Sequence, residues 1–200
     1  MRDFQSCSLL SFHDLMAGII AAMEARDAYT ASHSNRVSDM TEIICRLLDL
    51  SEAQAEDIHI AAHVHDIGKI GIEDSILRKN SPLDEIEWLS IKQHPIIGFN
   101  ILNKVSCFNE ISKIVRHHHE RWDGNGYPDG IRENEIPLGS RIIAIADSID
   151  AMMSNRQYRK CLSSSQCKEE IQKNAGIMYD PMLVEIVMKN WENIVGKIIF

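Results

Sequence analysis

Histidine and aspartate side chains recur along this chain at spacings that can build a metal site. His65 and Asp66 are adjacent, and Lys69 follows one helical turn later, so an imidazole, a carboxylate and an ammonium can face one cleft. Further candidate ligands of the same two types lie in other segments: His33, His94, His118, His119 and Asp147. Polar groups buried in apolar segments cost free energy unless they are paired or bind a metal. A shared metal centre is the simplest way to satisfy this set together.

Imidazole and carboxylate ligands without thiolate suit iron, manganese, zinc or nickel, and one carboxylate can bridge two ions. A water held between two divalent ions loses its proton near neutral pH and becomes a nucleophile, while the ions stabilise the charge that develops on a phosphate. These residues therefore predict hydrolysis of a phosphate ester. We expect two divalent metal ions as cofactors, with iron or manganese favoured.

The charge of the chain limits its substrates. The formal net charge is -8 over 200 residues, whereas proteins that bind long nucleic acids do so mainly through a basic footprint. We therefore expect no long nucleic acid as a partner. Two divalent ions would supply the positive charge that a small phosphate substrate needs and that the acidic protein lacks.

Several segments resemble the successive motifs of the HD-GYP family, in the family's order: HDIGKIGIEDSIL, HPIIGFNIL, HHERWDGNGYPDG, PLGSRIIAIADSIDAM, RQYRK and AGIMYDP. The resemblance covers residues 23–187, which is nearly the whole chain. An isolated HD pair is a weak signal, but the HD, HHE and GYP motifs together are a specific one. The resemblance implies a phosphodiesterase that hydrolyses cyclic di-GMP to linear pGpG through attack of a metal-bridging hydroxide. A second cleavage to GMP and a mixed cyclic dinucleotide as substrate both stay open.

The resemblance also implies roles for single residues. The metal ligands would be seven, with the carboxylate of Asp66 bridging two ions: His33, His65, Asp66, His94, His118, His119 and Asp147. Lys69 would contact the scissile phosphate and assist the leaving group, so Asp66 and Lys69 are the expected catalytic residues.

Substrate contacts are expected from two further segments. Arg156 and Arg159 would bind the phosphates or guanine edges of the substrate, and Asp150 would line the same pocket. The GYP signature itself would lie in a long loop beside the site and is formed by Gly126, Tyr127 and Pro128.

Two positions depart from the family pattern. Gln157 stands where a proline is usual between the two arginines, which can loosen the turn that presents Arg156. Tyr29 stands one helical turn before His33, where family members with a third metal carry a glutamate. A neutral phenol is a poor ligand for a hard divalent cation, so we expect two metals and not three.

Apolar residues at helical spacing, together with capping residues, predict helices along the chain. Ser51 with Gln54 forms a capping box at the start of one helix, and Ser165 and Pro181 are expected to open the last two. Residues 138–153 are apolar enough for a buried helix, although RIIAIA alone could be a strand. We expect an all-α single domain over residues 1–200, a bundle of about seven to nine helices with a metal cleft and a long GYP loop.

The sequence also bears on location and partners. No apolar run is long enough for a membrane span, and the N-terminus lacks the order of a secretory signal, so we expect a cytoplasmic protein. The chain resembles HD-GYP domains, which are output modules usually fused to receivers or sensors. We therefore expect a signalling partner, such as a receiver, a sensor or a diguanylate cyclase, in cis or in trans.

Two alternative functions remain. A nucleotidase or nucleotide phosphohydrolase of the wider HD group would keep the metal site but would not require the GYP loop or RQYRK. A non-catalytic receptor would bind the cyclic dinucleotide without cleaving it, and it would be expected to lack a ligand; none is missing here.

Overall fold

The computed structural model describes residues 18–21, 32–154 and 161–196. Within these ranges the chain is helical and contains no strand, which confirms the all-α expectation. The longer helices are α2 (His33–Leu47), α3 (Glu52–Val64), α5 (Glu85–Ile91), α6 (His94–Leu102), α7 (Asn109–His117), α8 (Leu138–Met153), α9 (Ser164–Lys173) and α10 (Pro181–Lys189). With the one-turn helices α4 (Asp74–Leu77) and α11 (Trp191–Ile194), the described ranges hold more helices than the expected seven to nine. The same ranges contain three 3-10 turns: η2 (Ile67–Gly71), η3 (Ser106–Phe108) and η4 (Glu133–Glu135).

Helix starts follow local capping chemistry. The Ser51 hydroxyl accepts from the backbone N–H of Gln54, and the Gln54 side chain accepts from Ser51 in return, as the sequence predicts. The prediction for α9 is wrong by two residues, because Ser163 forms the capping box and Ser165 lies in the first turn. The strand alternative for RIIAIA is also wrong, because this segment lies inside α8.

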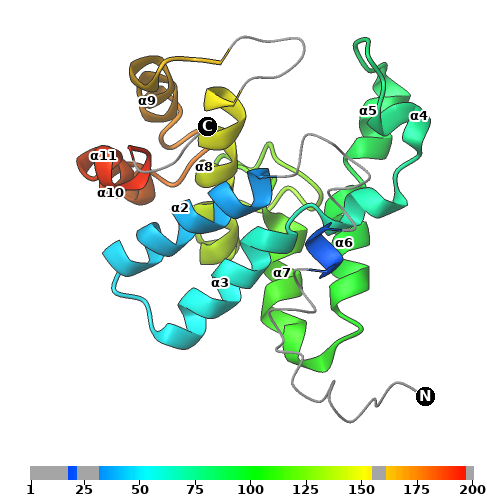
Figure 1. Cartoon of the computed structure of the whole chain (residues 1–200), viewed down its shortest axis with the longest axis horizontal. Coiled ribbons are helices and arrows are strands. Elements are labelled where there is room, and N and C mark those ends of the chain that lie inside the picture. The colour runs from blue at the N-terminus through cyan, green and yellow to red at the C-terminus, as the bar shows by residue number, and fades with distance from the viewer. Residues whose placement is uncertain (1–17, 22–31, 155–160, 197–200) are drawn as a thin grey trace, which may run out of the picture.

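The core forms where α2, α3, α7 and α8 pack together (Figure 1). Helix α2 lies along α3 and packs against α8, while α6 packs against α7 and η2. Fully buried apolar side chains of α2 and α8 belong to this core: Met40, Ile44, Ile142, Ile145 and Ile149. Each contributes roughly 1.5–3 kcal/mol by leaving water. The expected site residues are thus carried on a rigid helical frame.

Gly68 allows η2 and α6 to approach closely. A Cβ at this position would lie 1.8 Å from the carbonyl oxygen of His94, so no other residue fits without a backbone shift. The close approach brings the turn that carries His65 and Asp66 against the first residue of α6.

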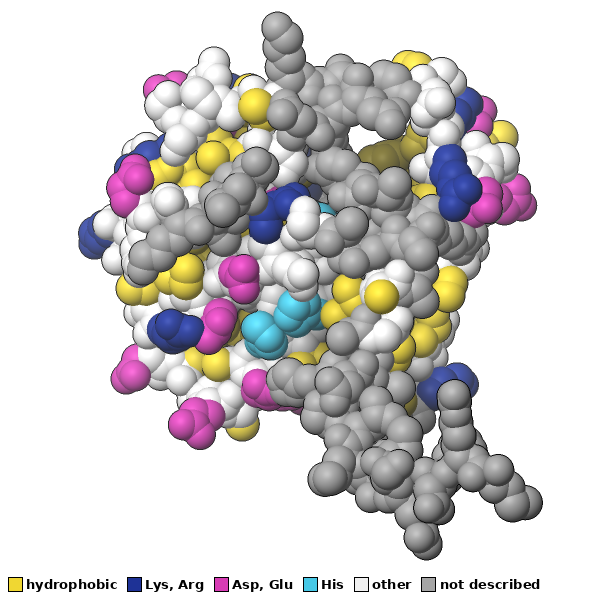
Figure 2. Space-filling view, in the orientation of Figure 1, with side chains coloured by type: hydrophobic (Ala, Val, Ile, Leu, Met, Phe, Trp, Pro, Cys, Tyr) yellow, Lys and Arg dark blue, Asp and Glu magenta, His cyan; other side chains and the backbone are white. Residues whose placement is uncertain are grey.

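Helices α4 and α5 form a lobe at the edge of the molecule (Figure 1). No residue of α5 is buried, and Ile86, Trp88 and Leu89 are 80%, 47% and 59% exposed. On the face drawn in Figure 2, acidic and basic side chains are interspersed and histidine side chains are visible near the centre. Among the described residues, no helix has the length and apolarity to cross a bilayer.

Candidate metal centre

Six of the seven predicted ligands lie where helices begin or end, and the seventh lies within a helix. His33 and His94 are the first residues of α2 and α6, His65 and Asp66 lie between α3 and η2, and Asp147 lies within α8. His118 and His119 directly follow α7. Helix ends bring side chains from five separate segments to one place, which a continuous helix face could not do.

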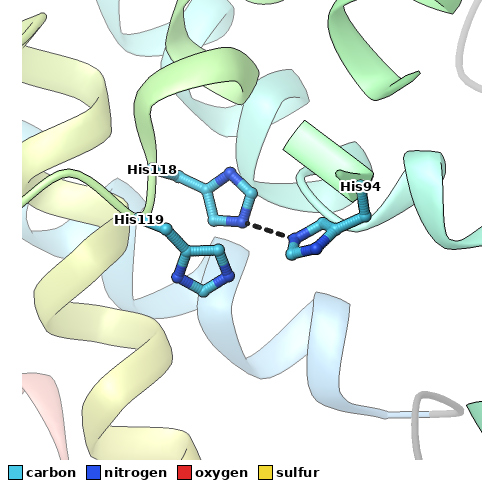
Figure 3. Close-up of side chains that lie close together, drawn as sticks. All are labelled: His94, His118 and His119. Carbon is cyan, nitrogen blue, oxygen red and sulfur yellow. Dashed lines mark hydrogen bonds between the residues drawn. The ribbon is translucent and has the colours of Figure 1, made fainter. Parts of the chain in front are cut away.

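The ligand atoms form two groups. His33, His65 and Asp66 each offer one atom within 4.8 Å of the other two, and all three residues are buried. We call this group the α2 half. Figure 3 shows the second group, the α6 half, in which the rings of His94, His118 and His119 converge from α6 and the end of α7.

The carboxylate of Asp66 lies between the two halves. Its Oδ2 is 3.5 Å from Nε2 of His65, whereas its Oδ1 is 3.4 Å from Nε2 of His94. One oxygen therefore faces each half, which is the arrangement that a bridging ligand requires. Asp147 joins the α2 half, with its Oδ1 3.3 Å from Nε2 of His33.

Hydrogen bonds at Nδ1 indicate that the imidazole lone pairs converge. Three rings donate from Nδ1 to a carbonyl oxygen three residues earlier: His65 to Ala62, His94 to Ile91 and His118 to Val115, at 2.7, 2.8 and 2.6 Å. His33 donates from Nδ1 to Asp150 instead, at 2.7 Å. In a neutral ring that carries its proton on Nδ1, Nε2 presents a lone pair.

These lone pairs face one another at short range. Nε2 of His33 lies 3.3 Å from Nε2 of His65, and Nε2 of His94 lies 3.3 Å from Nε2 of His118 (Figure 3). Lone pairs at this distance repel unless a cation lies near both. The donor set, imidazoles with carboxylates and no thiolate, fits divalent transition metals.

The electrostatics of the α6 half keep its ligands neutral. Burial, with the charges of neighbouring histidines, lowers the pKa of His118 far below its ordinary value and that of His119 to about 3. Burial alone would raise the pKa of Asp66, but Lys69 and the surrounding histidines hold it well below its usual range. Neutral imidazoles and an ionised carboxylate are the forms that bind metals.

Lys69 lies beside the bridging carboxylate. Its Nζ is 2.6 Å from Oδ2 of Asp66, and its side chain is 27% exposed. The ammonium is thus partly exposed and lies beside the carboxylate oxygen that faces the α2 half.

The loop that carries the GYP signature lies against the α6 half. The Tyr127 ring stacks on the His119 ring with centroids 4.8 Å apart, and the Tyr127 N–H donates to the His119 carbonyl oxygen at 3.2 Å. A Cβ at Gly126 would lie 2.3 Å from the Arg121 nitrogen, so this position requires glycine. The peptide bond between Tyr127 and Pro128 is cis.

Glu120 anchors the same loop and was not singled out from the sequence. Its Oε1 accepts from the N–H groups of Asp129 and Gly130, at 2.7 and 3.1 Å. Asp129 in turn forms a bidentate pair with Arg116 and a 3.0 Å contact with His117. The HHE motif thus supplies two candidate ligands and one loop anchor.

Asp150 corrects one expectation. The sequence suggested that it lines the substrate pocket, but its side chain is fully buried behind His33 and has no surface to offer a substrate. Arg36, which sequence reasoning missed, binds both of its oxygens. The signal available in the sequence was spacing, since Arg36 lies one helical turn after His33.

Four positions singled out from the sequence fall outside the described residues. They are the expected substrate-binding residues Arg156 and Arg159, Gln157 between them, and Tyr29, on which the expectation of two metals depends. All four stay predictions.

The sequence matches the HD domain family over residues 18–183. It is 36% identical over 185 residues to 3'3'-cGAMP-specific phosphodiesterase 2 of Vibrio cholerae, which covers 92% of this chain and 35% of that protein. It is 42% identical over 168 residues to a cyclic di-GMP phosphodiesterase of Thermotoga maritima, covering 83% of this chain and 46% of that protein. The chain therefore spans less than half the length of these two relatives.

Solved structures share the fold. A crystal structure of a cyclic GMP-AMP specific phosphodiesterase from V. cholerae matches with a TM-score of 0.69 and 21% identity, covering 90% of this chain and 48% of that one. The HD domain of the L. monocytogenes phosphodiesterase PgpH matches with a TM-score of 0.63 and 16% identity, covering 89% of this chain and 97% of that one. At these identities the similarity establishes the helical fold alone.

Proposed function

Because this chain belongs to the HD domain family, in its HD-GYP branch, we propose that it is a metal-dependent phosphodiesterase that hydrolyses cyclic di-GMP to linear pGpG. The observation that carries the proposal is the convergence of imidazole lone pairs in two groups on either side of one carboxylate. Two bound divalent ions would supply an ionised water as nucleophile and positive charge opposite the phosphate.

We assign the ligands by halves. In the α2 half they are His33, His65 and Asp147, and in the α6 half they are His94, His118 and His119, with Asp66 shared between them. The backbone and Asp150 hydrogen bonds at Nδ1 fix the ring orientations, so the donor atoms are in place before any ion arrives.

Lys69 is the proposed general acid. A phosphate held next to Asp66 lies within reach of the Lys69 ammonium, which already contacts that carboxylate. The ammonium can stabilise charge on a non-bridging oxygen and give a proton to the leaving ribose oxygen. Burial and the nearby carboxylates raise the pKa of Tyr127, so its phenol stays protonated and is not the base in this scheme.

The substrate must also be bound outside the metals. We propose that Arg156 and Arg159 hold the second phosphate or a guanine edge, since arginine forms paired hydrogen bonds with both. A specific observation favours a second candidate substrate, because some relatives are named for 3'3'-cGAMP and others for cyclic di-GMP. A signalling partner that controls turnover is also proposed.

Product analysis tests the function. Protein purified without oxygen and loaded with Mn²⁺ or Fe²⁺ is incubated with cyclic di-GMP, with 3'3'-cGAMP and with nucleoside mono- and triphosphates. We expect linear dinucleotide from a cyclic substrate and none from the Asp66→Ala protein. Cleavage of mononucleotides alone would support a nucleotidase, and binding without cleavage by the metal-loaded protein would support a receptor; either result overturns the proposal.

A further inference from the structure

Four of the candidate ligand histidines have an Nδ1 hydrogen bond, and these four are not held in the same way. His65, His94 and His118 each use a carbonyl three residues earlier in the chain. His33 instead uses a carboxylate 117 residues away, on α8. Its orientation therefore depends on the packing of α2 against α8, whereas the other three depend on a local turn.

The carboxylate that holds His33 is itself held by α2. Arg36 donates from Nε to Oδ1 of Asp150 and from Nη2 to Oδ2, the latter at 3.1 Å. Ser154 adds a weaker contact to Oδ2 at 3.3 Å. Arg36 lies one turn after His33, so two side chains of α2 donate hydrogen bonds to one side chain of α8.

Because both side chains are largely buried, breaking the Arg36–Asp150 ion pair costs free energy. Asp150 is 0% exposed and the Arg36 side chain is 13% exposed. A buried carboxylate that loses its cation is destabilised, and it would have to find new donors by moving. Any such movement displaces His33, because the Asp150 oxygen that accepts from Arg36 Nη2 also accepts from His33.

We propose that the Arg36–Asp150 pair positions His33 and so sets the metal affinity of the α2 half independently of the α6 half. The inference rests on the proposed metal centre. It predicts that the two metals bind with unequal affinity and that the α2–α8 contact controls loading of one of them. Residues that support a ligand through hydrogen bonds typically change metal affinity by about 10- to 100-fold.

Mn²⁺ titration of the metal-free 200-residue chain, with free Mn²⁺ followed by electron paramagnetic resonance, tests this inference. We expect Arg36→Met and Asp150→Ala to weaken one of two Mn²⁺ sites by about 10- to 100-fold, with partial recovery in Arg36→Lys. Arg46→Met is the matched control, because Arg46 lies on the same helix but pairs with Glu42 at the surface. It should leave both sites unchanged.

Double mutants identify the half that is affected. Combined with His33→Ala, Arg36→Met should cause no further loss, because its effect passes through His33; combined with His94→Ala, the losses should add. Equal weakening of both sites, no weakening, or additivity with His33→Ala would overturn the inference. Far-ultraviolet circular dichroism of the metal-free variants confirms folding, and Arg36→Lys keeps the test open if Asp150→Ala does not fold.

The outcome is separable from the proposed function, because the titration needs no turnover. A chain that cleaves no cyclic dinucleotide but loses one Mn²⁺ site in Arg36→Met would refute the function and support the inference. If the wild-type chain cleaves cyclic di-GMP and the Arg36→Met variant binds both ions normally, the proposed function is supported and the inference is refuted.

Discussion

The two halves of the histidine centre offer similar donor atoms but are supported differently. The α6 half is held by a local carbonyl at each of His94 and His118 and by a ring stack on His119. In the α2 half, His65 is also held by a local carbonyl, but His33 depends on a charged pair between α2 and α8. Local turns are set by nearby sequence, whereas the charged pair forms only after distant helices have packed. The orientation of His33 therefore depends on helix packing, whereas the orientations of His65, His94 and His118 depend on local turns.

The most disruptive change removes the residue common to both halves. In Asp66→Ala the shared carboxylate is lost, so we expect both ions to bind weakly and hydrolysis to fall below detection. Metal content by plasma emission spectrometry, together with chromatographic product analysis, measures this. Near-normal turnover by a metal-replete variant would remove Asp66 from the mechanism.

Lys69→Ala should separate chemistry from metal binding. Lys69 contacts the carboxylate of Asp66 but is not itself a proposed ligand, so both ions should stay bound. Removing a charged donor aimed at the transition state should lower kcat by about 100- to 1000-fold. An unchanged kcat would show that Lys69 has no role in catalysis and only neutralises the charge of Asp66.

Tyr127→Ala should affect the α6 half alone. Loss of the ring stack on His119 removes about 1 kcal/mol, which corresponds to about fivefold weaker binding of one Mn²⁺. Tyr127→Phe keeps the ring and should bind as the wild type does. If Tyr127→Ala weakened the α2 half instead, the comparison between the halves would fail.

The smallest effect is expected in the loop outside both halves. The Arg116 guanidinium lowers the pKa of Asp129 below its ordinary value, so the folded carboxylate binds protons less readily than the unfolded one. Its stabilisation is present above the unfolded pKa and is lost as pH falls through the folded pKa. Asp129→Asn should therefore lower the free energy of unfolding near pH 7 by less than about 1 kcal/mol. Thermal unfolding across pH should show the difference vanish in acid; a difference that grows in acid would contradict this assignment.

Much of the fold was predictable because its signals are local. The capping box at Ser51 and the apolar run of residues 138–153 lie where the structure has α3 and α8. The misplaced cap at Ser165 shows the limit of such reasoning, since Ser163 and Ser165 are chemically equivalent and only the position of Gln166 selects between them.

The candidate ligands could be named from the motifs, but their arrangement could not. The resemblance names the residues, yet nothing in the sequence shows that Asp150 is buried or that Arg36 binds it. Pairing between residues 36 and 150 depends on how α2 crosses α8. The burial of Asp150 and its pairing with Arg36 are tertiary properties, and because of them Asp150 supports His33.

The most direct test of the account is an anomalous diffraction experiment on crystals of the Mn²⁺-loaded chain. We predict two peaks about 3.5–4 Å apart, one bonded to His33 and His65, the other to His94 and His118, with Asp66 bonded to both. A single peak, or two peaks that share no Asp66 ligand, would contradict the two-metal centre. A third fully occupied peak bonded to protein beside Tyr29 would contradict the expectation of two ions.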